Sequence, residues 1–205
     1  MSTPRLVLAT HNQHKIDELR AILVPELPSL DPTAIVGARD VGAPEPVEDG
    51  VTFAENALIK ARALAAFTGL PAVADDSGLA VDVLGGAPGI FSARWSGRHG
   101  DDRANLDLLL AQLGDIADEH RAARFVCAAA LVTPDGAEHV ELGYLEGRLA
   151  HAPRGDHGFG YDPILIVQGG ELTAAELAPE AKNAISHRGQ AFRALLPSVV
   201  QVLSA

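Results

Sequence analysis

The sequence predicts an α/β fold built on a mixed β-sheet. Apolar runs of strand length alternate with segments of helical periodicity along all 205 residues, which is typical of a sheet flanked by helices. The turn Pro134-Asp135-Gly136 separates two strand-like runs and predicts an antiparallel hairpin, so the sheet is expected to be mixed. No repeat, low-complexity tract or linker divides the chain, and we expect a single domain over residues 1–205.

The first half of the chain predicts strand, helix, connection, helix and strand in that order. Residues 5–9 form a short apolar run, and apolar positions from 16 to 23 then have helical spacing until Pro25 and Pro28. A long acidic connection, with a strand near 35–36, leads to Thr52 and Glu55, whose spacing is that of a capping box. The helix that follows is expected to end at Gly69. Residues 71–74 predict a short buried strand that ends in the polar stretch 75–78.

The second half predicts the hairpin and two further helices. A glycine-rich turn over 85–89 precedes a helix over about 102–114, with Gly114 as its expected C-terminal cap. Strands are expected over 125–133, 138–145 and 164–167, and Thr173 and Glu176 repeat the capping-box spacing. The last helix is expected over about 189–203 with Ser186 as its N-cap, and Pro197 should kink or split it.

The composition excludes several classes of protein. The chain carries 16 Lys and Arg against 27 Asp and Glu, a formal net charge of −11, which opposes binding to a nucleic acid polymer. The apolar run at 6–9 is too short for a signal-peptide core, and no run reaches membrane-spanning length. A single cysteine, Cys127, excludes an intrachain disulfide. We therefore expect a cytoplasmic protein with no membrane or nucleic acid partner, and a mononucleotide stays compatible with its charge.

Two segments suit phosphate and magnesium. The loop Thr10-His11-Asn12-Gln13-His14-Lys15 joins a strand to a helix, where free N–H groups and the helix dipole attract an anion, although an N-cap explains the same residues. Asp75 and Asp76 follow a strand, so their side chains are expected on opposite faces. Mg²⁺ needs one or two carboxylates beside substrate phosphate, and Glu48 is the candidate second ligand. An Asp-rich turn with capping side chains is the alternative interpretation.

Further segments have side chains suited to binding a nucleotide base or a phosphate group. Phe159, Gly160, Tyr161 and Asp162 combine rings, an acid and a glycine, which favours a flat ligand but also fits a turn packed on its own rings. The segment Ser186-His187-Arg188 opens the last helix with donors for a carbonyl or a phosphate. Only three of the 16 basic residues are lysines, which suit phosphate oxygens but also ordinary solvated helix positions: Lys15, Lys60 and Lys182. Together these segments point to a nucleotide ligand.

The same segments resemble the inosine/xanthosine triphosphate pyrophosphatases, also called noncanonical purine NTP pyrophosphatases. The motifs that carry the resemblance occur in the family's order over nearly the full chain: Thr10-x-Asn12-x-x-Lys15, Thr52-Phe53-x-Glu55-Asn56-Ala57-x-x-Lys60-Ala61, Asp75-Asp76-Ser77-Gly78-Leu79, Gly85-Gly86-x-Pro88-Gly89, Phe159-Gly160-Tyr161-Asp162-Pro163 and Ser186-His187-Arg188. His11, His14 and Pro197 depart from the family's pattern, and the sequence offers no interpretation of them.

The resemblance implies a homodimeric, Mg²⁺-dependent enzyme with an elongated mixed sheet and two lobes around a central cleft. It implies hydrolysis of ITP, dITP or XTP to the monophosphate and pyrophosphate, which cleanses the nucleotide pool. Asp76 resembles the family's general base and metal ligand, with Glu48 as second ligand and Glu45 or Asp49 as alternatives. The remaining substrate contacts implied by the resemblance are residues 10–15, Lys60, Ser77, residues 159–162, Lys182, His187 and Arg188.

Two alternatives stay open at this point. A non-catalytic nucleotide-binding module would hold a nucleotide in the same loops without cleavage, although Asp76 would then be dispensable. A pyrophosphatase for other nucleoside triphosphates would catalyse the same reaction on substrates that carry a different base.

Overall fold

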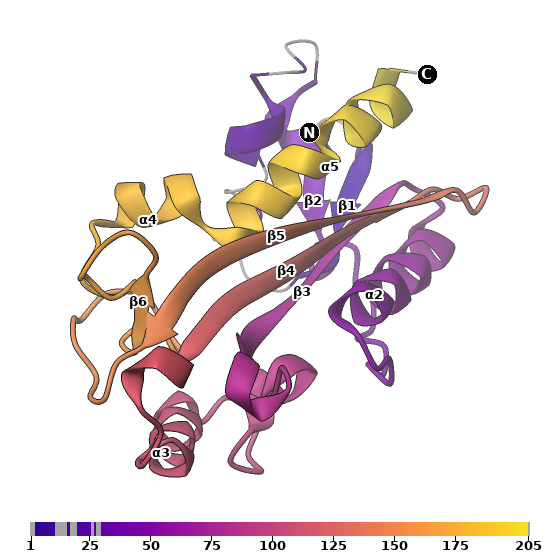
Figure 1. Cartoon of the computed structure of the whole chain (residues 1–205). Coiled ribbons are helices and arrows are strands. Elements are labelled where there is room, and N and C mark those ends of the chain that lie inside the picture. Colours follow the sequence, from indigo (N-terminus) through magenta and orange to yellow (C-terminus); the bar gives the residue numbers. More distant parts are fainter. Residues whose placement is uncertain (1–2, 11–15, 17–19, 26, 28–29, 205) are drawn as a thin grey trace. The chain divides into compact units, whose positions relative to one another are not determined.

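The computed structural model describes residues 3–10, 16, 20–25, 27 and 30–204 of the chain. Strands in this part form one six-stranded sheet in the order β2-β1-β3-β4-β5-β6. β1 is parallel to β2 and to β3, whereas β5 and β6 are antiparallel, so the expected mixed α/β fold is confirmed (Figure 1). The strands are β1 (Leu6–Leu8), β2 (Ile35–Gly37), β3 (Ala72–Val81), β4 (Ala122–Val132), β5 (Glu138–Leu149) and β6 (Leu165–Val167).

Helices of two kinds accompany the sheet. The α-helices are α2 (Phe53–Thr68), α3 (Asp102–Gln112), α4 (Pro179–Ile185) and α5 (His187–Ser204). The short 3-10 helices are η1 (Pro32–Ala34), η2 (Asp82–Leu84), η3 (Gly89–Arg94) and η4 (Asp118–His120). Residue 16 and residues 20–23 have helical backbone, where the first helix is expected. In the described part of the chain, every helix is too short or too polar to cross a bilayer.

The capping box predicted for α2 is present. The Thr52 hydroxyl oxygen accepts a hydrogen bond from the N–H of Glu55 at 3.1 Å. The Glu55 carboxylate reaches back to the N–H of Val51 at 2.7 Å, one residue before the cap. Gly69 ends the helix with a φ of 66°, a left-handed conformation that glycine adopts without steric cost. The sequence therefore marks both ends of this helix.

The chain divides into two compact units, each with its own apolar core. Unit 1 consists of Met1–Asp76, Cys127–Gly143 and Arg188–Ala205, and unit 2 of Ser77–Val126 and Tyr144–His187. In unit 1 the odd-numbered side chains of β4 from Cys127 to Leu131 pack with α5, and the even-numbered ones from Ala128 to Val132 pack with α2. Accordingly, α5 and α2 lie on opposite faces of the sheet (Figure 1).

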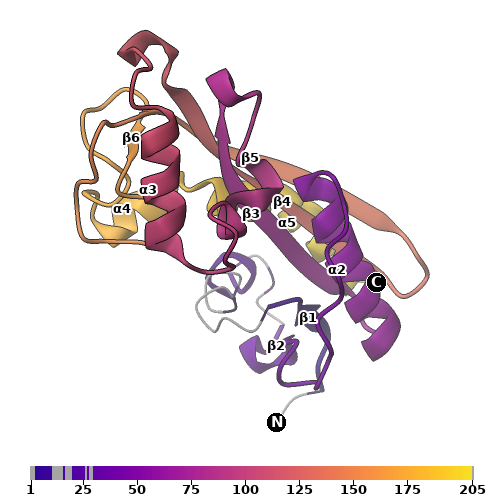
Figure 2. The same cartoon turned by 90° about the horizontal axis from the view of Figure 1, so that it is seen from below.

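The core of unit 2 forms between α3 and the strand segments of the unit (Figure 2). Beside it lies a fully buried arginine, Arg121, at 1% exposure. Its guanidinium donates to the carbonyl oxygens of Leu113 at 2.6 Å, Leu149 at 2.9 Å and Ala150 at 2.9 Å. These acceptors compensate for the loss of water, although burial still lowers the pKa of Arg121.

The largest correction to the sequence analysis concerns residues 75–78. The predicted end of the strand before residue 75 is wrong, as is the alternative of an Asp-rich turn, because β3 continues through residues 75–78 to Val81. Aspartate and glycine are poor strand formers, but strand preference depends strongly on tertiary partners. Here both carboxylates are bound by side chains from helices.

Three smaller expectations also differ from the structure. α3 ends at Gln112 and its C-terminal cap is Leu113, whereas Gly114 was expected to be the cap. Thr173 and Glu176 form a turn and begin no helix: the N–H of Thr173 donates to the Glu176 carboxylate at 2.8 Å, and the N–H of Glu176 donates to the carbonyl oxygen of Thr173 at 3.0 Å. α5 is one helix that contains Pro197, so it is not split there. α4, which begins with Pro179, has no cap side chain and was not predicted.

Candidate active site

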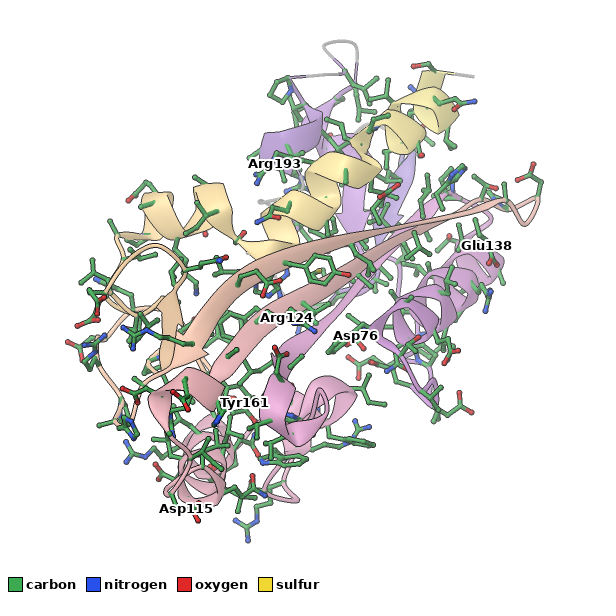
Figure 3. The ribbon with its side chains drawn as sticks, in the orientation of Figure 1. Asp76, Asp115, Arg124, Glu138, Tyr161 and Arg193 are labelled. Atoms are coloured by element: carbon green, nitrogen blue, oxygen red, sulfur yellow. The ribbon has the colours of Figure 1, made fainter. Side chains whose placement is uncertain are left out.

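Asp75 and Asp76 are adjacent on β3 and have different partners, as the alternation of strand side chains predicts. The Asp75 carboxylate is buried and accepts a hydrogen bond at 3.1 Å from Nε of Arg188, in the first turn of α5. The Asp76 carboxylate accepts at 3.1 Å from Nδ2 of Asn56 in α2. Figure 3 shows Asp76 on the side of β3 that faces α2. The Asp76 carboxylate therefore lies among the polar side chains of α2.

A lysine joins Asp76 to a second carboxylate. Nζ of Lys60 lies 3.6 Å from Oδ1 of Asp76 and 3.2 Å from Oε2 of Glu48. Lys60 and Asn56 are four residues apart in α2, so both side chains lie on one face of the helix. Lys60 and Asp76 are largely shielded from water, with 15% and 17% of their side chains exposed, whereas 38% of the Glu48 side chain is exposed.

The charge balance of this cluster favours a further cation. Burial raises the pKa of Asp76, because the charged carboxylate loses hydration. The Lys60 charge and the Asn56 hydrogen bond oppose this shift, while the negative charges of Glu48 and Asp75 reinforce it. Lys60 therefore supplies one positive charge beside the two carboxylates of Asp76 and Glu48.

The donor set suits Mg²⁺. Glu48 and Asp76 supply hard carboxylate oxygens, and both approach the same positive charge. The described residues include no group of three His, Cys, Asp or Glu side chains placed to hold a metal. Mg²⁺ does not require one, since it binds through one or two carboxylates together with substrate phosphates and water. The residues present therefore fit this ion.

The predicted phosphate loop is described only at its first residue. Thr10 follows β1, is 8% exposed and donates its backbone N–H to the carbonyl oxygen of Leu8 at 2.8 Å. His11, Asn12, Gln13, His14 and Lys15 lie outside the described residues. Ser77 follows Asp76 on β3.

In unit 2, three of the predicted nucleotide contacts form one cluster. Nζ of Lys182 donates to Oδ2 of Asp162 at 2.5 Å, and the same oxygen accepts from the N–H of Phe159 at 2.8 Å. The Lys182 ammonium also lies 5.5 Å from the centre of the Phe159 ring, within cation–π distance. The Asp162 side chain is almost buried, whereas Phe159 is 66% exposed. An exposed ring is thus held beside a charged pair.

The loop that carries Phe159 is anchored on both sides. The Tyr161 hydroxyl donates to the carbonyl oxygen of Ser92 at 2.9 Å, and the N–H of Gly160 donates to Asp102 at 3.0 Å. Tyr161 is 5% exposed, and burial raises the pKa of its hydroxyl. Gly158 has a φ of 79°, and a β-carbon there would collide with the Asp162 carboxylate. These contacts fix the backbone on both sides of Phe159.

His187 is oriented by an aromatic neighbour. Its ring stacks on Phe125 of β4, with ring centres 5.1 Å apart and an interplanar angle of 22°. Phe125 is 7% exposed and belongs to the core of unit 2, so it is a fixed support.

Sequence reasoning missed the supporting residues Asn56, Phe125 and Asp102. Asn56 occurs in a motif of the family, but the motif alone assigns it no contact. The sequence pattern indicates an ordinary core residue of a strand at Phe125 and an acidic residue in the first turn of a helix at Asp102. Their contacts join segments that are 20 to 62 residues apart, so local spacing carries no signal for them.

Comparison with known proteins confirms the family resemblance. The model of the Ham1 family matches residues 6–198. A "dITP/XTP pyrophosphatase" of Streptomyces coelicolor is 66% identical over 200 residues, covering 97% of this chain and 98% of the relative. A Ham1 protein from Coxiella burnetii superposes with a TM-score of 0.87 at 41% identity, over 97% of this chain and 100% of that one. The structure of a dITP/XTP pyrophosphatase from Mycobacterium abscessus superposes with a TM-score of 0.82 at 54% identity, over 95% of this chain and 99% of that one. The chain belongs to the Ham1 family.

Proposed function

We propose that this protein hydrolyses noncanonical purine nucleoside triphosphates, namely ITP, dITP and XTP, to the monophosphate and pyrophosphate. The observation that carries the proposal is the group formed by Asp76, Glu48 and Lys60 in a chain 66% identical to a dITP/XTP pyrophosphatase. Paired carboxylates with a lysine are what phosphoryl chemistry needs, because the reaction is governed by positioning and charge neutralisation.

Asp76 is the proposed general base. Its carboxylate orients a water molecule and takes a proton from it as the water oxygen attacks the α-phosphorus. The bond from that phosphorus to the bridging oxygen breaks, and pyrophosphate leaves. Burial supports this role, because it raises the pKa of Asp76 toward the range in which a carboxylate accepts a proton more readily.

Glu48 and Asp76 would hold Mg²⁺, which would neutralise charge on the triphosphate and orient it. Lys60 lies within 3.6 Å of both carboxylates and would stabilise charge that develops on the phosphate chain. Residues 10–15, including Lys15, are the proposed triphosphate loop, and Ser77 a further substrate contact. These roles follow from the family resemblance together with the chemistry of each side chain.

The base is proposed to bind the residues of unit 2 and the start of α5. Phe159 offers an exposed ring face for stacking, with Gly160, Tyr161, Asp162 and Lys182 around it. His187 and Arg188 would donate to the 6-oxo group of hypoxanthine or xanthine. Adenine carries an amino group there, so the same donors would be left mismatched and ATP would be a poor substrate.

We extend the proposal to a cytoplasmic homodimer, as the family resemblance implies. The single cysteine, which is buried, is compatible with a reducing compartment. Sedimentation of the purified chain measures the dimer directly.

One experiment tests the activity. The protein is incubated with Mg²⁺ and ITP, XTP, GTP, ATP or dTTP, and pyrophosphate and monophosphate are measured. We expect equal amounts of both products from ITP and XTP and little from ATP. Binding without products would support a nucleotide-binding module instead, and preference for another base would support a different pyrophosphatase.

A further inference from the structure

We propose that Asn56 is a positioning residue for the proposed hydrolysis, which acts by fixing the Asp76 carboxylate and the backbone beside Glu48 through one buried amide. The inference rests on the proposed function, since Asp76 and Glu48 are the groups that Asn56 would hold. It assigns a role to a residue that touches neither substrate nor metal.

Both ends of the Asn56 side chain are engaged. Its Nδ2 donates to Oδ2 of Asp76 at 3.1 Å, and its Oδ1 accepts from the N–H of Gly50 at 2.9 Å. Asn56 is 2% exposed, so water competes little for these bonds. Gly50 is two residues after Glu48, so the amide ties the strand that carries one acid to the segment that carries the other.

The amide also fixes which oxygen of Asp76 faces Asn56 and which faces Lys60. Oδ2 is occupied by Asn56, while Oδ1 is the oxygen that lies 3.6 Å from Lys60. A carboxylate held at one oxygen has a restricted rotation, and its second oxygen is thereby directed toward the Lys60 and Glu48 side of the cluster. A proposed base or metal ligand needs this fixed direction.

Asparagine suits the position because it donates and accepts at once. Aspartate would accept from Gly50 but has no N–H for Asp76, and it would place a second negative charge beside it. A β-carbon on residue 50 would lie 2.7 Å from Oδ1 of Asn56, so glycine permits the approach. The cap of α2 is Thr52, and asparagine is a weak helix former, so helix formation does not explain Asn56.

The test compares Asn56→Asp and Asn56→Ala with a matched control. Asn105 is another buried helical asparagine, at 1% exposure, and its Oδ1 accepts from the N–H of Ser96 at 2.7 Å. Asn105→Asp makes the same substitution away from Asp76. We expect kcat for ITP to fall about 10- to 100-fold in both Asn56 variants, with a much smaller change in KM. Asn105→Asp should leave kcat close to that of the wild type.

Side-chain NMR of the full chain provides a readout besides activity. The Nδ2 protons of Asn56 should exchange slowly with solvent in the wild type and faster in Asp76→Ala. The Gly50 amide should stay protected in Asn56→Asp, which keeps the acceptor, and should exchange faster in Asn56→Ala. Unchanged Asn56 exchange in Asp76→Ala would overturn the inference, as would a kcat loss no larger than that of the Asn105 control.

Failure of the proposed function looks different. A wild-type protein that releases no pyrophosphate from any nucleotide would overturn the activity, while the NMR readouts would still decide whether Asn56 holds Asp76. If the wild type prefers another triphosphate, the comparison of kcat with KM is made with that substrate.

Discussion

Nε of Arg188 lies 3.1 Å from Oδ2 of Asp75, and this contact joins the first turn of α5 to the middle of β3. Only 12% of the Arg188 side chain and 1% of the Asp75 side chain are exposed. A buried ion pair costs desolvation on both sides, so the removal of one partner leaves an uncompensated charge. Asp75 thus holds Arg188, one of the proposed base contacts. Asp76 instead accepts a hydrogen bond from Asn56 in α2.

Substitution of Asp75 should therefore destabilise the protein strongly. We expect Asp75→Ala to lower the free energy of unfolding by about 3–5 kcal/mol, measured by urea denaturation. The matched comparison is Arg62→Ala, which removes an exposed ion pair with Glu138 at 2.6 Å and should cost about 0.2–1 kcal/mol. Equal losses in the two variants would contradict a structural role for the buried pair.

Asp76→Asn should separate activity from stability. Removal of the proposed base and metal ligand should lower kcat for ITP by about 100-fold or more. Burial raises the pKa of Asp76 in the folded protein above its unfolded value, so its ionisation opposes folding at neutral pH. The variant should therefore unfold at a higher temperature than the wild type at pH 7.

The sign of this effect gives a pH test. The stabilisation by Asp76→Asn should shrink as the pH falls through the raised pKa of Asp76, and should vanish below the ordinary value near 3.8. Thermal unfolding in EDTA at several pH values measures it without bound metal. A difference that grows as the pH falls would show that burial does not raise this pKa.

Metal removal should identify the second carboxylate. We expect EDTA to abolish pyrophosphate release and added Mg²⁺ to restore it. Glu48→Gln should raise the Mg²⁺ concentration for half-maximal activity about 10- to 100-fold, because the proposed site loses a charged ligand. Glu45→Gln and Asp49→Asn test the two alternatives, and a larger shift in either one would transfer the role from Glu48.

His187 and its aromatic support should govern the choice of base. His187→Ala should narrow the ratio of ITP to ATP turnover, because it removes a proposed donor to the 6-oxo group. Phe125→Leu should narrow the ratio less, since the stacked ring at 5.1 Å orients His187 and touches no substrate in the proposal. Phe67→Leu, at a position 54% exposed, serves as the control. An unchanged ratio in His187→Ala would remove that residue from base selection.

Local sequence patterns predicted most of the fold. The capping box at Thr52, the glycine at position 69 and the hairpin turn at 134–136 each depend on neighbours a few residues away, and the structure contains all three. The mixed sheet followed from that hairpin. Prediction failed at residues 75–78, where the low strand preference of Asp and Gly is overridden by partners in α2 and α5.

By itself the sequence determined which chemical groups the protein has and the family to which it belongs, because motifs are read from residue types in order. Only the tertiary structure decided which partners bind the side chains of adjacent residues. The family motif distinguishes Asp76 from Asp75, but only the structure shows that Arg188 binds Asp75 whereas Asn56 and Lys60 bind Asp76. The physical reason is that strand side chains alternate between faces, and the helix packed on each face supplies different partners.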